Sequence, residues 1–334
     1  MKYTKYILVF VLLISLFFGT IPQKSVKKTE YMLDTVISIT AYGKNAKKAV
    51  DEAFNEIKRL DNLLNAFSPE SEISKINQNA SNGFVSVNPE VYHLIKYAVG
   101  LSNSTFGAFD ITLKPVSDLW GFNTENAHVP KTSEIEAALK KTGTENLEFD
   151  DNSSAIRFKL PEMAIDLGAI AKGYASSRAA QTLKINGVEN AILDLGGNIC
   201  TIGKRPLAFF EGIANGGFYK PFKIGIQNPT GARGESIHTI TAEEDICVIT
   251  SGSYERYFEE NGKRYHHIID PKTGRPSENG INSATIVSKE GALGDALSTA
   301  TFVLGKDGIE KITPLCDLVI IIDSENKIFE YRKD

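Results

Sequence analysis

Apolar residues recur at helical spacing in the first half of the chain. The longest such stretch covers positions 46–64 and places seven apolar side chains on one face, namely Ala46, Val50, Ala53, Phe54, Ile57, Leu60 and Leu64. This spacing predicts a helix. A second helix should begin at Asn88 and Pro89, because Asn is a preferred N-cap and Pro fits the first helical position. The stretch 133–141 predicts a third, short helix that Gly143 ends.

The second half of the chain has a different pattern, with short apolar runs separated by glycine turns. Strands are predicted at 32–41 and then, from Met163 onward, at 191–195, 222–226, 246–250, 283–287 and 318–322, the last of which pairs with 327–331 as a hairpin. A helix from about Ile170 to Lys184, stopped by Gly187, interrupts them. Strands that do not alternate regularly with helices predict an α+β fold of mixed, mainly antiparallel sheets with flanking helices.

The composition is that of an ordinary globular enzyme. The chain has 334 residues, of which 42% are hydrophobic and 23% charged, enough for a large core in one compact unit or in two subdomains. The net charge is -4, and Lys and Arg form no long run. Without a positive net charge or a basic run to attract nucleic-acid phosphates, nucleic acid is not an expected partner.

The N-terminus has the pattern of an export signal. Lys2 and Lys5 precede an apolar run, Tyr6–Phe18, as the positive and hydrophobic regions of a signal do. We therefore expect the protein to work outside the cytoplasm, at the outer face of the cell membrane or in a periplasm-like space. A cleaved signal and a retained membrane anchor both stay open, because about 15 apolar residues are few for a full span. A polar linker is expected at 23–28, which divides the chain into residues 1–28 and a domain of residues 29–334.

The cysteines predict free thiols rather than disulfides. The three cysteines, Cys200, Cys247 and Cys316, lie inside or beside apolar segments. An odd and low number argues against a disulfide framework, so buried free thiols are expected. No C-x-x-C or H-E-x-x-H motif is present, which disfavours a zinc site.

Asp295 and Thr299 are the first candidates for chemistry. They are four residues apart on a predicted helix, so both side chains lie on one face. Together they offer two hard oxygens, the ligands that Mg²⁺ prefers while it retains room for phosphate. A capping or solvated pair is the alternative for this common spacing.

Two segments place an acid next to glycine. In the segment 107–112, Asp110 follows a glycine turn, either as a site residue or as the cap of a helix start. In the segment 164–173, an apolar strand ends in Asp166, Gly168 permits close backbone approach, and a helix begins whose free N–H groups can meet phosphate.

Two further segments have a turn at their centre. Gly196-Gly197 suits a hairpin turn better than a phosphate site. In the segment 265–276, a tight turn follows the pair His266-His267 and Asp270, so a histidine here is either a general base or a structural residue. The segment 250–252 is rich in hydroxyls but lacks the G-x-S-x-G frame, and no P-loop or Rossmann fingerprint occurs.

Eight motifs in order resemble those of the FAD:protein FMN transferases, the ApbE family. They are Met32–Thr35, Ser71–Ser74, Gly107–Asp110, Asp166–Gly173, Asp194–Asn198, Thr250–Gly252, His267–Pro271 and Asp295–Ala300. The similarity extends over residues 31–305, and it implies the T-fold-like architecture of that family.

The resemblance also implies an activity and a site. Family members bind FAD and Mg²⁺ outside the cytoplasm, cleave the pyrophosphate, release AMP and join FMN to a threonine hydroxyl of an acceptor protein. Acceptors are membrane-facing subunits of redox complexes with a threonine-containing motif. By similarity, His267 handles the proton of the attacking hydroxyl. The metal ligands would be Asp295, Thr299 and the Ala169 carbonyl, and the flavin nucleotide would contact Met32, Phe67, Ala108, Phe109, Asp110, Asp166, Lys172, Thr250, Ser251 and Gly252.

One position departs from the family. Phe67 stands where the family usually has a tyrosine, so the ring is kept and the hydroxyl is lost. This leaves the balance between transfer to protein and hydrolysis by water open, with an FAD pyrophosphatase as the second interpretation. A non-catalytic extracytoplasmic flavin-binding protein is the third.

Overall fold

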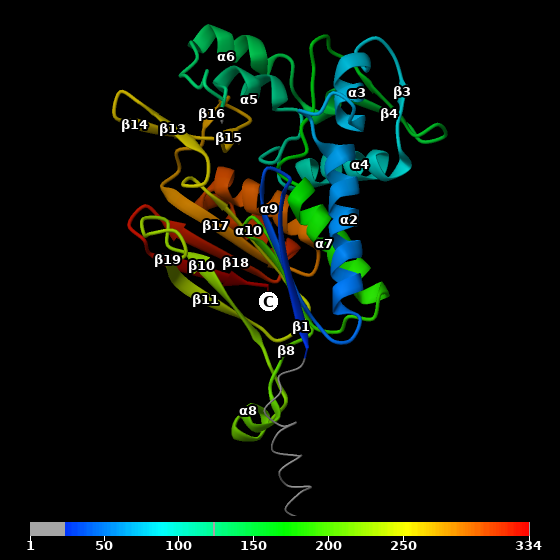
Figure 1. Ribbon diagram of the computed structural model, residues 1–334. Helices are drawn as coiled ribbons and strands as arrows, with labels where there is room; N and C mark the ends of the chain where they lie inside the picture. Colours follow the sequence, from blue (N-terminus) through cyan, green and yellow to red (C-terminus); the bar gives the residue numbers. More distant parts are fainter. Residues whose placement is uncertain (1–23, 123, 334) are drawn as a thin grey trace, which may run out of the picture.

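A sheet of eight antiparallel strands forms the centre of the molecule. The computed structural model describes residues 24–122 and 124–333. The strand order is β1-β2-β6-β7-β12-β17-β18-β19 (Figure 1), with every neighbouring pair antiparallel. The strands are β1 (Ser25–Met32), β2 (Thr35–Tyr42), β6 (Ala191–Leu195), β7 (Asn198–Ile202), β12 (Cys247–Gly252), β17 (Ile281–Ser288), β18 (Leu318–Asp323) and β19 (Ile328–Arg332). The predicted α+β class with mainly antiparallel sheets is confirmed.

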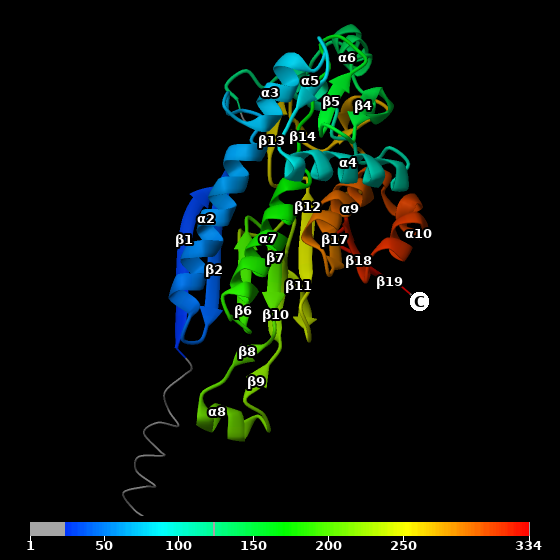
Figure 2. The same ribbon diagram turned by 90° about the vertical axis from the view of Figure 1, so that its right-hand side faces the viewer.

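Three helices cover one face of this sheet. They are α2 (Ala46–Leu64), α7 (Ala171–Ile185) and α9 (Gly291–Leu304) (Figure 2). Side chains alternate across a strand, so Ile37, Ile39 and Ala41 of β2 all point into the core shared with α2 and are 0% exposed. The amphipathic face predicted for 46–64 forms the other half of this core.

A two-stranded sheet covers part of the opposite face. It consists of β10 (Phe222–Gln227) and β11 (Ser236–Ala242), and its apolar side chains pack against Val248, Val287 and Ile320 of the central sheet. All six residues of β18 are buried, because both faces of that strand are covered. This explains why β18 reads as one continuous apolar run rather than as an alternating strand.

The remaining elements lie at the two ends of the sheet. At one end (upper in Figure 1) are α3 (Glu72–Asn79), α4 (Pro89–Ser104), α5 (Lys114–Trp120), α6 (Thr132–Leu139) and the strands β3 (Val85–Ser86), β4 (Leu147–Asp150), β5 (Ala155–Phe158), β13 (Tyr257–Glu260), β14 (Lys263–His266), β15 (Ile269–Asp270) and β16 (Arg275–Pro276). From the other end project β8 (Arg205–Pro206), α8 (Phe209–Ala214) and β9 (Tyr219–Lys220). The short helix α10 (Ile309–Ile312) follows α9.

Several local predictions are confirmed. The second helix begins as expected, with the Asn88 side chain accepting a hydrogen bond from Glu90 N at 2.8 Å. Gly196 and Gly197 form the turn between β6 and β7 with φ of +63° and +90°, the positive values that a type I′ hairpin turn needs at both central positions. The hairpin of β18 and β19 is also present.

The linker predicted at 23–28 is wrong for residues 25–28. These residues belong to β1, which pairs with β2 from Ser25↔Tyr42 to Met32↔Thr35. The polar composition reflects an edge strand with solvent on one side, where Lys28 forms ion pairs with Glu30 and Asp51 at 2.8 and 2.9 Å. The predicted signal or anchor lies outside the described residues. Within residues 24–122 and 124–333, no helix is long and apolar enough to cross a membrane.

The strand predicted around Met163 is also wrong. The stretch 163–167 joins no sheet, because the Asn77 side chain takes the place of a neighbouring strand. Its amide accepts from Ile165 N at 2.8 Å and donates to Ile165 O at 2.9 Å. Asp166 N donates to Ile111 O at 2.8 Å. The backbone groups are therefore satisfied without a ladder.

The expectation of three free thiols is wrong for two of them. Cys200 on β7 and Cys247 on β12 are register partners, and their Cα atoms are 4.1 Å apart in a disulfide. Both are buried, at 1% and 5% exposure. A count of cysteines does not reveal which strands are neighbours, so the pair was missed. Cys316 is a buried free thiol, as predicted.

Loss of the disulfide should lower stability. We expect the double variant Cys200→Ala/Cys247→Ala to lose about 2–4 kcal/mol of unfolding free energy, the typical contribution of such a bond. Urea unfolding of wild type with and without dithiothreitol should reproduce the same difference. Cys316→Ala is the control and should remain as sensitive to the reductant as wild type. An oxidised wild type no more stable than the double variant would contradict the prediction.

Candidate functional site

The site forms where helices α7 and α9 cross. The crossing is so close that a Cβ on Gly173 would lie 2.1 Å from Gly291 O and 2.7 Å from Asp295 Cβ. Asp295 is 4% exposed, and its Oδ2 accepts a hydrogen bond from Gly173 N at 2.9 Å. Gly173 lies in the first turn of α7, where backbone N–H groups have no partner within the helix. The carboxylate therefore caps α7 from another helix, at its positive end.

The three predicted metal ligands lie around this crossing. Ala169 is two residues before the first residue of α7, so its carbonyl belongs to the same helix end as the Asp295 carboxylate. Thr299 is one turn further along α9, and its hydroxyl lies 3.3 Å from Ser251 Oγ. Ser251 Oγ is also 2.8 Å from Ser298 Oγ. These contacts bring the predicted segment 250–252 to the same place.

The donor set suits a hard divalent cation. A carboxylate, a hydroxyl and a carbonyl are all oxygen ligands, and Mg²⁺ takes six in near-octahedral geometry, usually with water and phosphate among them. Across the described ranges, no three His, Cys, Asp or Glu residues are grouped so as to hold a metal. An ion here would depend on substrate phosphate and water for its other ligands. Ala169, Asp295 and Thr299 therefore fit magnesium shared with a phosphate better than a metal held by protein alone.

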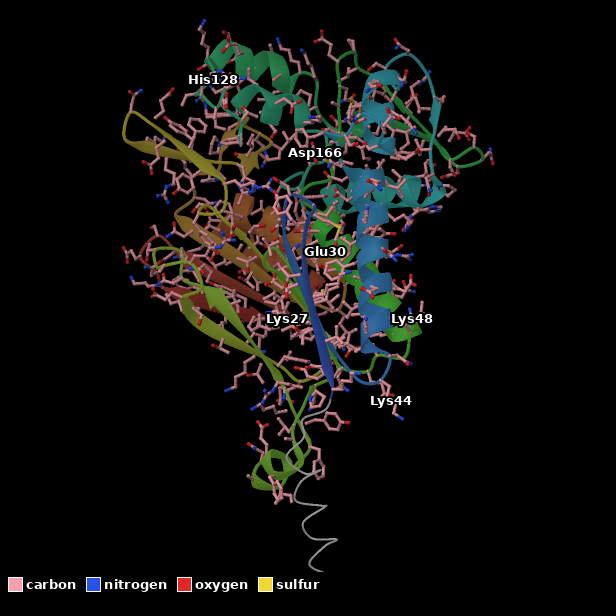
Figure 3. The ribbon with its side chains drawn as sticks, viewed as in Figure 1. Lys27, Glu30, Lys44, Lys48, His128 and Asp166 are labelled. Carbon is pink, nitrogen blue, oxygen red and sulfur yellow. A yellow bond between two sulfur atoms is a disulfide. The ribbon has the colours of Figure 1, made fainter. Side chains whose placement is uncertain are left out.

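Asp110 and Asp166 belong to neighbouring segments, because Asp166 N donates to the carbonyl of Ile111, the residue after Asp110, at 2.8 Å. Asp110 Oδ1 accepts from Thr112 N at 2.7 Å and from Thr112 Oγ1 at 2.6 Å. Burial raises the pKa of the Asp110 carboxyl above its ordinary value, and the bonds from Thr112 partly oppose that rise. Helix α5 begins only at Lys114, so Asp110 stabilises a turn and does not cap the helix. Asp166 Oδ1 accepts from Gly168 N at 2.8 Å, and Asp166 lies between the upper helices and the sheet (Figure 3).

Some predicted nucleotide contacts are restricted by burial. The Phe109 ring is 1% exposed and Ala108 is 5% exposed. Both residues can therefore contact a ligand mainly through their backbone atoms. Thr250 Oγ1 is 2.7 Å from Thr285 Oγ1 on the neighbouring strand. Gly252 has no room for a side chain, because a Cβ there would meet the Tyr254 ring at 2.5 Å.

His267 is a neutral imidazole, and one of its ring nitrogens is already hydrogen-bonded. Its Nδ1 is 3.2 Å from Arg256 O, and a carbonyl only accepts, so Nδ1 carries the proton and Nε2 keeps its lone pair. Desolvation, followed by the positive charges of Arg256 and Lys172, lowers the pKa of His267 to about 3. The ring is therefore a proton acceptor at neutral pH, and Lys172 lies near enough to influence it.

Arg256 ties this histidine segment to the tip of the first hairpin. Its guanidinium forms an ion pair with Asp34 Oδ2 at 2.8 Å. Leu33 and Asp34 form the turn between β1 and β2, with φ of +51° and +56°. The half-buried Met32 is the last residue of β1 before that turn. The predicted flavin contact Met32 and the predicted base His267 thus belong to one connected part of the structure.

Phe67 lies at the rim of the site. Its ring is 77% exposed, and Lys114 Nζ is 4.6 Å from the ring centroid. Lys114 begins α5, directly after the turn that Asp110 stabilises. The Phe67 ring is therefore available for stacking, and it presents no hydroxyl.

Sequence reasoning missed the residues that hold these parts together. Arg256 and Asp34 are ordinary charged residues in the sequence, and their pairing across 222 positions has no sequence signal. Gly173 and Gly291 did have a sequence signal, since a glycine within a helix often marks close packing. Two surface hollows are lined by β11 with β18 and β19, and by α10 with β19. Neither includes a predicted site residue.

Comparison with known proteins identifies the family. The model of the ApbE family matches residues 33–318. An FAD:protein FMN transferase of Klebsiella pneumoniae is 34% identical over 252 residues, which cover 75% of this chain and 74% of that protein. Another, of Treponema pallidum, is 30% identical over 296 residues, or 86% and 81% of the two chains. The crystal structure of the ApbE protein from Thermotoga maritima matches with a TM-score of 0.82 and 34% identity, covering 93% of this chain and 97% of that one.

These matches, together with the fold, define the protein as an enzyme of the transferase class. The chain belongs to the ApbE family. The family resemblance that the eight motifs predicted is thereby confirmed, as is its architecture.

The low pKa of His267 makes stability depend on pH. Between an unfolded pKa of 6.5 and a folded pKa of about 3, the unfolded chain binds the extra proton, so stability falls as the pH drops below about 6.5. This one group lowers the free energy of unfolding by at most about 1.4 kcal/mol for each pH unit of acidification. Urea unfolding from pH 7.5 to 4.5 should therefore show a smaller loss for His267→Gln than for wild type.

The exposed histidine His128 (Figure 3) provides the control for this measurement. His128→Gln should keep the wild-type dependence on pH. Equal slopes for wild type and His267→Gln would show that the folded protein accepts the proton on His267 readily.

Proposed function

We propose that the protein transfers FMN from FAD to a threonine hydroxyl of an acceptor protein in a Mg²⁺-dependent reaction that releases AMP. The observation that carries this proposal is the position of the Asp295 carboxylate. It lies at the N-terminus of α7, one helical turn from the Thr299 hydroxyl. The names of the relatives, FAD:protein FMN transferase, support the same chemistry.

Phosphoryl transfer depends mainly on positioning and on neutralising charge. A bound Mg²⁺ would supply charge for the pyrophosphate, with Asp295, Thr299 and Ala169 as its protein ligands. Lys172 adds a cation on the side of His267. The carboxyl oxygens of Asp110 and Asp166 would accept hydrogen bonds from donors of the nucleotide.

His267 is the group proposed to take the proton. Its Nε2 would accept the threonine hydroxyl proton while the threonine oxygen bonds to the FMN phosphorus. The bond from that phosphorus to the bridging oxygen breaks, and AMP leaves with the electron pair. Desolvation lowers the pKa of the free histidine most, and the charges of Arg256 and Lys172 lower it further. An anionic pyrophosphate beside them would offset these charges, so substrate binding should make the imidazole more basic.

The disulfide supports the proposed location outside the cytoplasm. Disulfides persist in oxidising compartments and are rare in the cytosol, and Cys200–Cys247 joins two central strands of the sheet. The export pattern at the N-terminus agrees with it. The proposed acceptors are membrane-facing redox subunits that carry a threonine motif.

Hydrolysis of FAD is the second candidate function. It is favoured by one observation, the exposed Phe67 ring without the hydroxyl that the family usually has there. If that side of the nucleotide is held less firmly, water can reach the phosphorus in place of threonine. The products would be FMN and AMP, with no modified acceptor.

Incubation of the full chain with FAD, MgCl₂ and a threonine-bearing acceptor domain tests these functions. We expect the acceptor to gain the mass of one FMN group and AMP to appear in equal amount. An acceptor with Val in place of that threonine, and a reaction with EDTA, should show neither. Free FMN and AMP with an unmodified acceptor would establish the pyrophosphatase instead. Unchanged FAD would overturn both.

Two substitutions on α9 test the metal ligands. Asp295→Asn keeps an oxygen for the Gly173 N–H but removes the charge, and Thr299→Val removes the hydroxyl at nearly constant shape. We expect each to lower the transfer rate at least about 100-fold, because charge stabilisation by a metal is worth several kcal/mol. Raising the MgCl₂ concentration should recover part of the activity of Thr299→Val.

Thr301→Val on the same helix is the matched control for Thr299→Val. The Thr301 hydroxyl is buried and makes no hydrogen bond within the described part of the chain, so its removal should leave activity unchanged and stability equal or higher. Normal Mg²⁺-dependent transfer by Asp295→Asn would refute the ligand assignment.

A further inference from the structure

The excursion between β7 and β10 exposes apolar side chains at its tip. It comprises β8, α8 and β9 and projects from the end of the sheet that lies opposite the upper helices (Figures 1 and 2). Phe210, Ile213, Phe218 and Tyr219 are 38%, 59%, 50% and 53% exposed. Isolated exposed apolar residues are ordinary, but several in one short segment indicate an interaction surface.

The described chain begins at the same end of the molecule. Lys24 O accepts from Gly43 N at 2.9 Å, and Tyr42 N donates to Asn190 O at 3.0 Å. The Asn190 side chain accepts from Lys204 N at 3.0 Å, one residue before β8. These bonds connect the start of β1 directly to the base of the excursion.

Unpaired lysines surround this end. None of the following forms an ion pair within residues 24–122 and 124–333, and all are exposed: Lys24, Lys27, Lys44, Lys47 and Lys48. Figure 3 shows Lys27, Lys44 and Lys48 on the lower half of the molecule. The acids nearby are mostly engaged, since Asp51 pairs with Lys28 and Glu211 with Arg205 and Lys220. Glu52 and Glu189 remain exposed acids at this end.

We propose that this end of the protein docks on an anionic lipid bilayer. The apolar side chains of the excursion enter the interfacial region, and the lysines contact the lipid phosphates. Aromatic and aliphatic side chains beside lysines are typical of interfacial binding, and each lysine near an anionic surface contributes about 1 kcal/mol. We name this surface, residues 205–220 with Lys24, Lys27, Lys44, Lys47 and Lys48, the docking end.

The chain outside the described residues favours a bilayer over another partner. The apolar run Tyr6–Phe18 ends six residues before Lys24, which span at most about 20 Å when extended. If that run binds a membrane, the docking end lies within this distance of it. The excursion then adds a second contact, which fixes the orientation of the protein and turns the predicted site away from the bilayer.

Two tryptophan variants of the full chain test the docking end. Tyr219→Trp reports on the excursion, and Phe84→Trp is the matched control before β3 in the upper part, since the two residues are 53% and 49% exposed. The native Trp120 is 0% exposed. Its fluorescence is the background in both variants, and this background is measured with the wild-type protein. Each variant is mixed with vesicles of phosphatidylglycerol and phosphatidylethanolamine that contain brominated acyl chains.

We expect brominated lipid to quench and blue-shift the tryptophan at 219 and to leave the one at 84 unaffected. Zwitterionic phosphatidylcholine vesicles or 0.5 M NaCl should weaken the quenching, as screening of the lysines requires. Equal quenching at both positions would indicate unspecific adsorption and overturn the proposal. So would an emission at 219 that is already blue-shifted without vesicles and stays unquenched with them, because the chain's own N-terminal segment would then cover the tip.

The readout is independent of catalysis. Both variants should modify a soluble acceptor at the wild-type rate, because neither residue belongs to the predicted site. Quenching without flavin transfer would leave the docking end in place and reject only the proposed function.

Discussion

The hydrogen bond between the Asp295 carboxylate and Gly173 N is the contact on which the site depends. It requires α7 and α9 to approach so closely that only glycine fits at positions 173 and 291. The same bond satisfies a free N–H of α7 and holds the carboxylate at the N-terminal end of that helix, which Ala169 precedes by two residues. The helix cap and the proposed metal ligand are thus the same carboxylate. A substitution that keeps an oxygen at position 295 preserves the cap, and it removes the negative charge that the proposed metal site needs.

The central sheet makes this approach possible. Helices α2, α7 and α9 pack on one face of the eight strands, and β10 with β11 packs on part of the other. The predicted site residues come from segments at the end of the sheet near the upper helices. Arg256 connects the first hairpin to the His267 segment, and Asp166 connects the segment after Met163 to the turn at Asp110. Rigid elements therefore position side chains that are far apart in sequence.

The long, periodic elements could be predicted from the sequence, and so could the order of the family motifs. The helix at 46–64 and the strand at 318–322 have apolar patterns that local physics determines. The disulfide could not be predicted, because it depends on β7 and β12 being neighbours. The stretch 163–167 has the composition of a strand, but the Asn77 side chain satisfies its backbone. The Arg256–Asp34 pair likewise depends on tertiary structure alone.

The order of strands in the sheet has a consequence for folding. Strand β2 pairs with β6, although all the upper helices and α7 lie between them in sequence, and the Asp295 carboxylate follows only after β17. Pairings between such distant segments add loop-closure entropy before the contacts form, which slows folding. A nascent chain must therefore extend through α9 before the Asp295 carboxylate can bond to Gly173 N and the crossing of α7 and α9 can form.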